Sequence, residues 1–328
     1  MKRLEERIFN ISDAGEFNNL ALEIFRLQAT KNAVYAQYLS HLGIDHSGIN
    51  HVDNIPFLPI ELFRTHKIIT GKTEPEVVFH SSGTSGQDTG KHYLASESLY
   101  RESFLRTFTK FYGNPKELCI LALLPSYMER GNSSLVFMMD HLIRMSCHEE
   151  SGFYLRNYEE LARVLDRRTI DYYPTLLLGV SFGLLDLAEK HPMTMTENIK
   201  VMETGGMKGK RKELVREELH GLLKKGFGVS VIHSEYGMTE LLSQAYAKKP
   251  GCYFTPPWMR VRVRDLYDPL TILPPGQAGG INIIDLANIY SCSFIATGDM
   301  GRMNENGSFD ITGRFDQAEV RGCNLMVI

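Results

Sequence analysis

Cysteine is scarce in this chain, and its pattern excludes two common uses of the residue. The five cysteines are scattered over 328 residues, are odd in number and show no C-x-x-C spacing. A disulfide framework or a zinc site would need paired or clustered cysteines. The pattern is typical of reduced thiols, and we therefore expect a cytoplasmic protein.

Long apolar runs and a strong excess of charge are also missing. No run approaches the roughly 20 residues that cross a bilayer, and the N-terminal Met-Lys-Arg-Leu-Glu-Glu does not resemble a secretory signal. The formal net charge of −3 gives no reason to expect nucleic acid or an anionic membrane as partner. With 43% hydrophobic and 23% charged residues, the composition is that of a soluble globular protein.

Hydrophobic spacing predicts helices first and then an alternation of strands and helices. Residues 1–45 are expected to be helical, with Asp13 and Glu16 resembling a capping box and Gly43 ending the segment. Further on, a helix closed by Gly113 precedes apolar runs that predict buried strands at 118–124, 175–179, 199–202 and 229–232. Such alternation indicates a largely parallel sheet covered by helices, with ligands at the carboxyl ends of its strands.

After about residue 250 the pattern changes. Val261 and Val263 alternate with Arg260, Arg262 and Arg264, which is the two-residue period of a strand, and Gly/Pro turns separate short strands beyond them. We predict an antiparallel, barrel-like region there. The expected organisation is a helical segment at 1–50, an α/β core at 51–250 and a β-rich subdomain at 251–328, continuous with the core.

The segment from His80 to Lys91 has the composition of a phosphate-binding loop. It reads His-Ser-Ser-Gly-Thr-Ser-Gly-Gln-Asp-Thr-Gly-Lys and follows the short apolar run 77–79. Backbone N–H groups that converge in such a loop form a concavity suited to phosphate. A flexible Ser/Gly loop is the alternative. The P-loop of nucleotidases is excluded by the glycine spacing and by the lack of Ser or Thr after Lys91.

Four further segments carry polar or glycine-rich turns, and the first three of them follow predicted strands. They are Thr204-Gly-Gly-Met207, Ser234-Glu-Tyr-Gly-Met-Thr-Glu240 after the run 229–232, Thr297-Gly-Asp299 after the run 293–296, and Gly313-Arg-Phe-Asp316. Aromatic, hydroxyl, carboxylate and guanidinium groups of these kinds suit base stacking, phosphate, Mg²⁺ and ribose. Each segment by itself could also be a plain turn.

Taken in order, these motifs resemble those of the adenylate-forming superfamily of acyl-CoA synthetases, luciferases and peptide-synthetase adenylation domains. The segments 57–65, 234–244 and Arg321-Gly-Cys-Asn324 further resemble the acyl-protein synthetase (LuxE-type) branch. The resemblance runs from about residue 50 to the end. It implies an α/β fold, namely an acyl-CoA-synthetase-like N-terminal core of helix-covered sheets with a smaller β-barrel-like subdomain, and an absent C-terminal lid domain.

The resemblance also implies ATP and Mg²⁺ as cofactors and a role for each matching residue. Tyr236 would stack on adenine, Thr239 would bind the α-phosphate, and Glu240 would hold the metal. Asp299 would bind the ribose hydroxyls, with Arg314 near ribose and phosphate. The loop would bind the β- and γ-phosphates through Ser81, Ser82, Gly83, Thr84, Ser85 and Gly86. The adenine pocket would be lined by Gly205 and Gly206.

Two departures from the superfamily pattern concern lysine. Typical members continue into a mobile domain with a catalytic lysine, whereas this sequence ends at Ile328, and Lys91 is displaced by two residues from the usual loop lysine. Lys91, Lys208 or Lys210 could supply the missing charge, or a partner could, or the protein is slow or inactive. His80 and His233 flank the motifs and could assist proton transfer, but we expect both to be structural histidines.

Cys323 is the candidate acyl acceptor that the resemblance implies. If residues 319–324 are extended, Arg321 and Cys323 share a face, and the cation lowers the pKa of the thiol. The predicted function is activation of a fatty or other carboxylic acid as acyl-AMP, with transfer to Cys323 and then to a partner such as an acyl reductase. The alternatives are a truncated ligase that uses CoA or a carrier-protein thiol, and an inactive nucleotide- or acyl-binding protein with Cys323 buried in a last strand.

Overall fold

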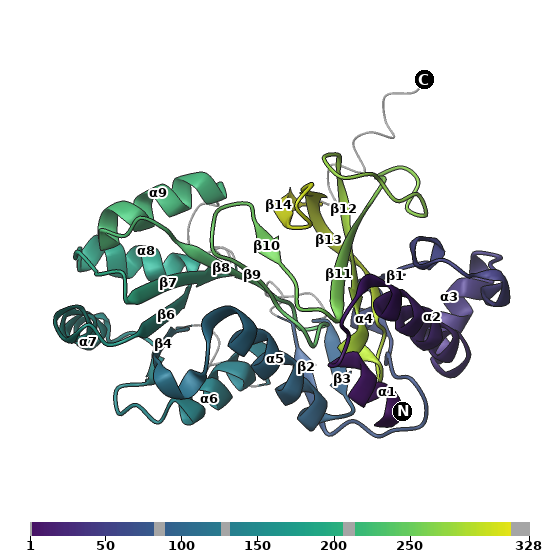
Figure 1. The fold of residues 1–328 in the computed structure, drawn as a ribbon, viewed down its shortest axis with the longest axis horizontal. Helices are drawn as coiled ribbons and strands as arrows, with labels where there is room; N and C mark the ends of the chain where they lie inside the picture. The colour runs from purple at the N-terminus through teal and green to yellow at the C-terminus, as the bar shows by residue number, and fades with distance from the viewer. Residues whose placement is uncertain (1, 82–88, 126–131, 206–213, 316–328) are drawn as a thin grey trace. The chain divides into compact units, whose positions relative to one another are not determined.

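The computed structural model describes residues 2–81, 89–125, 132–205 and 214–315. By contacts the chain divides into two compact units, one made of 74–256 and the other of 1–73 together with 257–328. The predicted segments 1–50, 51–250 and 251–328 stay predictions of domain organisation. Each unit contains both helices and strands (Figure 1).

The unit 74–256 is built on a parallel sheet, as the strand–helix alternation predicts. In spatial order its parallel strands are β5 (Gly152–Tyr154), β4 (Cys119–Leu123), β6 (Thr175–Val180), β7 (Ile199–Thr204) and β8 (His233–Tyr236). β9 (Ala245–Ala247) pairs antiparallel with β8, and β10 (Tyr253–Phe254) pairs antiparallel with β9. A separate hairpin joins β2 (Val77–His80) to β3 (Lys91–Leu94).

Helices cover both faces of this sheet (Figure 1). The connection from β4 to β5 runs in the opposite direction along the sheet from those that lead to β6, β7 and β8. Right-handed crossovers therefore place α6 on one face and α7, α8 and α9 on the other. The helices are α5 (Glu97–Tyr112), α6 (Ser134–Ser146), α7 (Tyr158–Asp171), α8 (Ser181–Lys190) and α9 (Arg216–Phe227), with a 3-10 turn at Pro115–Glu117.

One predicted strand of this unit is wrong in position. The run 229–232 was expected to be the strand before the Ser234–Glu240 motif, but β8 is His233–Tyr236, so the motif itself begins inside the strand. Residues 228–231 are exposed or only partly buried, whereas all four residues of β8 are buried. Pairing with Met202–Thr204 of β7 fixes this register, and polar side chains therefore form the buried strand.

The other unit has an antiparallel meander, as the two-residue period predicts. Its strands are β11 (Met259–Arg264), β12 (Ala278–Asp285), β13 (Phe294–Met303) and β14 (Phe309–Arg314), and β1 (Leu58–Pro59) pairs parallel with β13. Thr297-Gly-Asp299 was expected after a strand that ends at residue 296. It lies instead inside β13, because pairing with β14 continues the strand to Met303.

The N-terminal helices pack in the same unit as this meander. They are α1 (Lys2–Ile8), α2 (Ala14–Lys31), α3 (Ala33–His41) and α4 (Leu62–Thr65), with 3-10 turns at His46–Gly48, Val52–Asn54 and Leu286–Asn288. Asp13 caps α2 by accepting from the Glu16 N–H, as predicted. The buried amide of Gln28 donates to the carbonyl oxygens of residues 288, 289 and 291, which joins α2 to the loop before β13.

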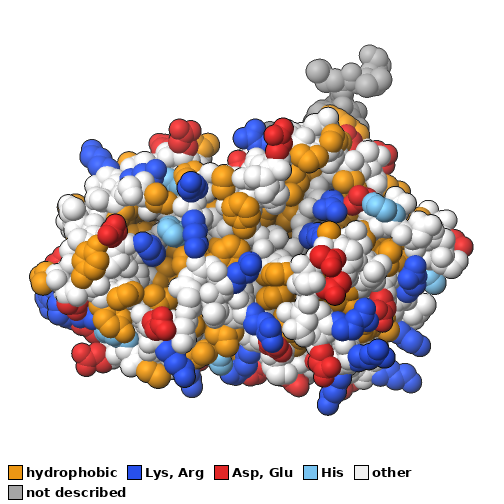
Figure 2. Space-filling model, viewed as in Figure 1, with side chains coloured by type: hydrophobic (Ala, Val, Ile, Leu, Met, Phe, Trp, Pro, Cys, Tyr) orange, Lys and Arg blue, Asp and Glu red, His pale blue; other side chains and the backbone are white. Residues whose placement is uncertain are grey.

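Two properties of the structure agree with the composition. Figure 2 shows acidic and basic side chains interspersed over the visible face, without a large area of one sign. Among the helices of the described residues, none has the length and apolar character needed to cross a bilayer.

Candidate functional site

The β2–β3 hairpin brings the loop motif against the Ser234–Glu240 motif. Ser81 directly follows β2, and its Oγ accepts a hydrogen bond from the Gly90 N–H at 2.8 Å. A β-carbon at position 90 would lie 2.6 Å from Oε1 of Glu240 and 3.0 Å from Oγ of Ser81. The hydroxyl and the carboxylate therefore meet over the bare α-carbon of Gly90, and only glycine leaves room for both.

A buried histidine fixes the backbone at the same place. His92 on β3 is 1% exposed, and its Nδ1 lies 2.8 Å from the carbonyl oxygen of Thr239. Because a carbonyl oxygen only accepts, Nδ1 is the donor. The sequence reasoning missed His92. The signal that could have found it is strand alternation, which puts position 92 on the buried face when Lys91 is exposed.

Lys91 lies on the opposite side of the hairpin from this contact. It is exposed, pairs in register with His80 and precedes the buried His92 by one residue. Successive side chains of a strand point to opposite faces, so Lys91 and His92 diverge. The catalytic role of Lys91 stays a prediction.

Glu235 is a buried carboxyl group between β7 and β8. The Thr204 hydroxyl donates to its Oε2, and a β-carbon at position 237 would collide with its Oε1. Burial, opposed by the Thr204 hydrogen bond and reinforced by the charge of nearby Glu203, raises the pKa of Glu235 to about 7. The group thus titrates near neutral pH directly before Tyr236.

The described part of the predicted adenine pocket lies at the carboxyl ends of β7 and β8. Gly205 follows β7 with φ of +66°, and its carbonyl oxygen accepts from the Ser181 hydroxyl at 2.6 Å. Tyr236 ends β8, is 9% exposed and meets Tyr253 edge-to-face with 6.0 Å between ring centroids. Stacking of Tyr236 on a base stays a prediction.

The candidate ribose residues lie together in the other unit. Asp299 on β13 is 4% exposed, and its Oδ1 accepts from Nε of Arg314 at 2.8 Å. The two residues are also in register across β13 and β14. The Asp299 N–H donates to the Thr297 hydroxyl at 3.1 Å. Asp299 is therefore held from both its backbone and its side chain.

Several predicted site residues fall outside the described residues. They are Ser82, Gly83, Thr84, Ser85, Gly86, Gly206, Lys208, Lys210, Arg321 and Cys323. Their roles stay predictions.

His233, which flanks the second motif, is held in its neutral form. Burial, together with the charges of Lys200 and Lys248, lowers its pKa to about 4. Its Nδ1 lies 3.0 Å from the Tyr112 hydroxyl. These surroundings support the structural reading of His233.

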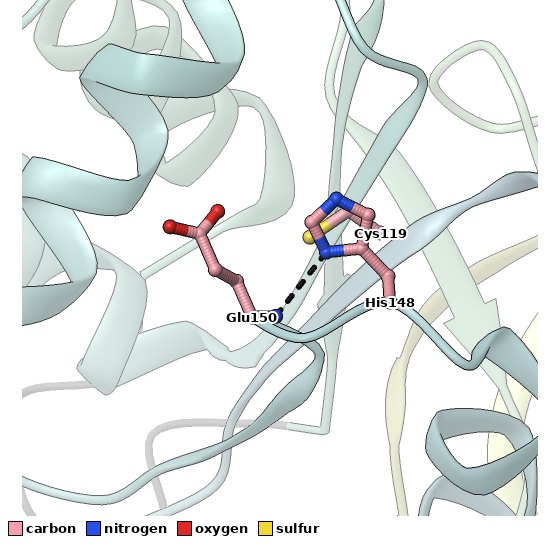
Figure 3. Close-up of side chains that lie close together, drawn as sticks. All are labelled: Cys119, His148 and Glu150. Atoms are coloured by element: carbon pink, nitrogen blue, oxygen red, sulfur yellow. Dashed lines mark hydrogen bonds between the residues drawn. The ribbon is translucent and has the colours of Figure 1, made fainter.

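Cys119, His148 and Glu150 form a cluster of potential metal ligands within 4.8 Å of one another (Figure 3). The Glu150 N–H donates to His148 Nδ1 at 3.2 Å, and Nη1 of Arg168 lies 2.8 Å from the other ring nitrogen. Arg167 and Arg168 also pair with the Glu150 carboxylate. Because N–H donors face both ring nitrogens and two guanidinium groups flank the carboxylate, we read this cluster as structural.

No family model and no curated protein matches the chain. Solved structures of adenylate-forming enzymes share its fold. One is a 2-hydroxyisobutyryl-CoA ligase in complex with 2-HIB-AMP and CoA, with TM-score 0.67, 13% identity, and coverage of 94% of this chain and 72% of the other. Another is ATP-bound MatB from Rhodopseudomonas palustris, with TM-score 0.55, 19% identity, and coverage of 72% and 47%.

A third is an O-succinylbenzoate coenzyme A synthetase from Bacillus subtilis in complex with ATP and a magnesium ion. Its TM-score is 0.51 at 17% identity, and the match covers 76% of this chain and 54% of the other. The chain thus spans about half the length of the MatB and O-succinylbenzoate enzymes. The predicted acyl-CoA-synthetase-like α/β fold is confirmed.

Proposed function

We propose that this protein is an ATP-dependent ligase that activates a carboxylic acid as acyl-AMP, with release of pyrophosphate. The observation that carries the proposal is the meeting of Ser81, Gly90 and Glu240, which joins a candidate phosphate loop to a candidate metal carboxylate. The shared fold and the ATP, magnesium and acyl-AMP named for the similar structures support it.

The residues at this junction fit Mg²⁺. The ion prefers oxygen ligands, especially carboxylates, and Glu240, which is 6% exposed, brings its carboxylate to the same glycine, Gly90, as the Ser81 hydroxyl. Mg²⁺ bound there would neutralise phosphate charge, which otherwise repels an attacking carboxylate. His92 would keep the Thr239–Glu240 backbone in place through its bond to the Thr239 carbonyl. The resemblance assigns the ribose to Asp299 and Arg314, and that assignment stays a prediction.

The decisive assay is carboxylate-dependent exchange of labelled pyrophosphate into ATP, run with a panel of fatty and aryl acids. We expect Glu240→Gln to lower the Mg²⁺-dependent rate on the order of 100-fold, because the charge at the metal is lost. Glu217→Gln removes an exposed carboxylate of α9 and should leave the rate unchanged.

Gly90→Ala tests the junction itself. The added methyl group must push aside the Glu240 carboxylate and the Ser81 hydroxyl, which are ends of side chains, so the fold should persist while exchange falls. Gly152→Ala is the matched control, since no atom lies within 4 Å of its added carbon. ATP binding without exchange for any acid would contradict adenylation and favour a nucleotide-binding protein without catalysis.

For the second half-reaction we propose that Cys323 attacks the acyl carbonyl carbon of acyl-AMP. The sulfur–carbon bond forms, AMP leaves, and the thiol proton passes to solvent. The support is the resemblance of Arg321-Gly-Cys-Asn324 to the acyl-protein branch, with an acyl reductase as the class of partner that would take the thioester. CoA or a carrier-protein thiol is the competing acceptor, favoured by the CoA bound in the hydroxyisobutyryl-CoA ligase.

Labelled acid and ATP separate these two acceptors. We expect wild type to carry hydroxylamine-sensitive label, Cys323→Ser to lose that label while pyrophosphate exchange continues, and Cys147→Ser, at an exposed cysteine, to keep it. Unlabelled wild-type protein, or a labelled Cys323→Ser variant, would contradict transfer to Cys323 and direct the search to an acyl-CoA product.

A further inference from the structure

The Thr297-Gly-Asp299 motif forms an irregularity of the sheet. Gly280 of β12 is level with Met300 of β13, but Asn282 is level with Ala296. One residue of β12, Ile281, therefore faces three residues of β13, Thr297, Gly298 and Asp299. A bulge of this kind interrupts the ladder and leaves backbone groups that need other partners.

The Arg264 guanidinium supplies those partners. Its Nη1 donates to the Ile281 carbonyl oxygen at 2.7 Å and to Oδ1 of Asn282 at 2.8 Å. Its Nη2 donates to the Thr297 carbonyl oxygen at 2.6 Å. A β-carbon at position 280 would lie 2.5 Å from Cζ of Arg264, so Gly280 provides the space in which the guanidinium lies.

These bonds lead directly to Asp299. The Thr297 hydroxyl donates to the same Ile281 carbonyl at 2.9 Å and accepts the Asp299 N–H at 3.1 Å. The Phe315 N–H donates to the Gly298 carbonyl at 2.9 Å, next to the Asp299–Arg314 pair. The backbone of the motif is thus tied down on both sides of Gly298, and Arg264 provides the tie on the Thr297 side.

The neighbouring arginines on the same face of β11 have different contacts. Arg260 lies over the Phe17 ring at 3.8 Å from its centroid and bonds Asn18, and Arg262 pairs with Asp53 at 2.6 Å. They connect β11 to the N-terminal segment. Arg264 differs from them in bonding to the bulge, which makes Arg262 a matched control.

We propose that Arg264 is a positioning residue that holds Asp299 in place to accept hydrogen bonds from both hydroxyl groups of the ribose of ATP. This rests on the proposed function, because it presumes that ATP is the nucleotide bound. A planar guanidinium reaches three acceptors that lie in different directions, whereas a lysine amine has a single donor atom. A positive charge at position 264 is therefore not enough to hold the bulge, and the planar geometry of the guanidinium is also needed.

The test compares binding of ATP and 2′-deoxy-ATP by titration calorimetry with Mg²⁺ present. We expect wild type to bind ATP on the order of tenfold more tightly than 2′-deoxy-ATP, because a carboxylate–hydroxyl hydrogen bond is lost. In Arg264→Met this ratio should approach one, because ATP loses the bonds of both hydroxyl groups whereas 2′-deoxy-ATP loses only that of its 3′-hydroxyl group. Arg262→Met should keep the wild-type ratio.

Arg264→Lys is a second variant, which keeps the positive charge and serves as the test if Arg264→Met does not fold. It should also bind ATP and 2′-deoxy-ATP with nearly equal affinity. Cooperative urea unfolding confirms that each variant is folded. A wild-type ratio in a folded Arg264→Met or Arg264→Lys protein would overturn the positioning role while leaving adenylation intact. Failure of wild type to bind ATP would overturn the proposed function, and ATP binding without ribose discrimination would overturn the role of Asp299 and this inference.

Discussion

At the scale of single residues, Glu235 is a buried carboxyl group whose pKa is shifted far from its ordinary value. It is buried, accepts a hydrogen bond from Thr204 and lies near Glu203, and its pKa is raised to about 7. An ordinary glutamate titrates near 4.5. Between these pH values the folded chain binds more protons than the unfolded chain, so the free energy of unfolding falls as pH rises through the interval.

Glu235→Gln should remove this pH dependence. We expect the variant to gain stability over wild type as pH rises from about 4.5 to about 7, reaching a constant difference of about 3 kcal/mol above that. Urea unfolding at a series of pH values measures the difference. The exposed Glu217→Gln variant should show no such trend, and a Glu235→Gln difference that is the same at pH 5 and pH 8 would contradict the prediction.

His92 shows that a residue outside every motif can be part of the candidate site. Tyr236, Thr239 and Glu240 could be assigned roles because their motif resembles a known one. His92 belongs to no motif, and its importance comes from a bond to Thr239, almost 150 positions away. Pattern reasoning places His92 on a buried face but cannot tell which backbone atom it meets there.

At the scale of elements, α8 and α9 pack closely enough to require glycine. A β-carbon at Gly226 would lie 2.6 Å from Cβ of Ala188 and 3.2 Å from its backbone. Gly221 lies in the same helix with no atom within 4 Å of such a carbon. Both glycines therefore lie in α9, but only Gly226 is packed against another helix at its α-carbon.

These positions give opposite predictions for one chemical change. Gly226→Ala should lower the free energy of unfolding by about 1–3 kcal/mol, because the methyl group forces α8 and α9 apart. Gly221→Ala should raise it by about 0.5–1 kcal/mol, because alanine loses less backbone freedom in a helix. Chemical denaturation of both variants checks this. Equal effects of the two changes would mean that the helices are not in the contact described.

Strand positions show where short-range patterns fail at this scale. The apolar run 229–232 looked like a strand, yet the strand is formed by the polar residues His233–Tyr236. Similarly, β13 continues through Thr297-Gly-Asp299 although glycine in that motif suggests a turn. In both cases pairing with a neighbouring strand decided the outcome, and a hydrophobic pattern carries no information about that partner.

At the scale of the whole molecule, the two units differ in how the chain builds them. The unit 74–256 is continuous in sequence, whereas the other unit forms only when residues 1–73 pack with residues 257–328. A continuous unit forms its core without closing a long loop, and core residues such as Phe104, Leu121 and Leu177 are completely buried.

We therefore expect the fragment 74–256 to fold by itself and the fragment 1–73 to remain without cooperative structure. Circular dichroism and urea unfolding of each purified fragment test this. A single sigmoidal transition for 74–256 and none for 1–73 is the expected result. Non-cooperative unfolding of 74–256 would show that its core depends on the rest of the chain.

The sequence by itself determined which segments could be helices and strands, and which chemistry they could carry. Caps such as Asp13, the end of α5 at Gly113 and the alternating burial of β11 follow from interactions within a few residues, which local patterns record. The acyl-CoA-synthetase-like fold followed from the order of motifs that resemble a known family, and it is confirmed.

Only the tertiary structure decided which of these groups meet. The close approach of Glu240 to Gly90, the bond of His92 to Thr239 and the bonds of Arg264 to the bulge join residues far apart in the chain. Such contacts depend on the order and register of strands and on the space left by a glycine. Those properties arise from the energy of the packed sheet as a whole, and no short stretch of sequence contains them.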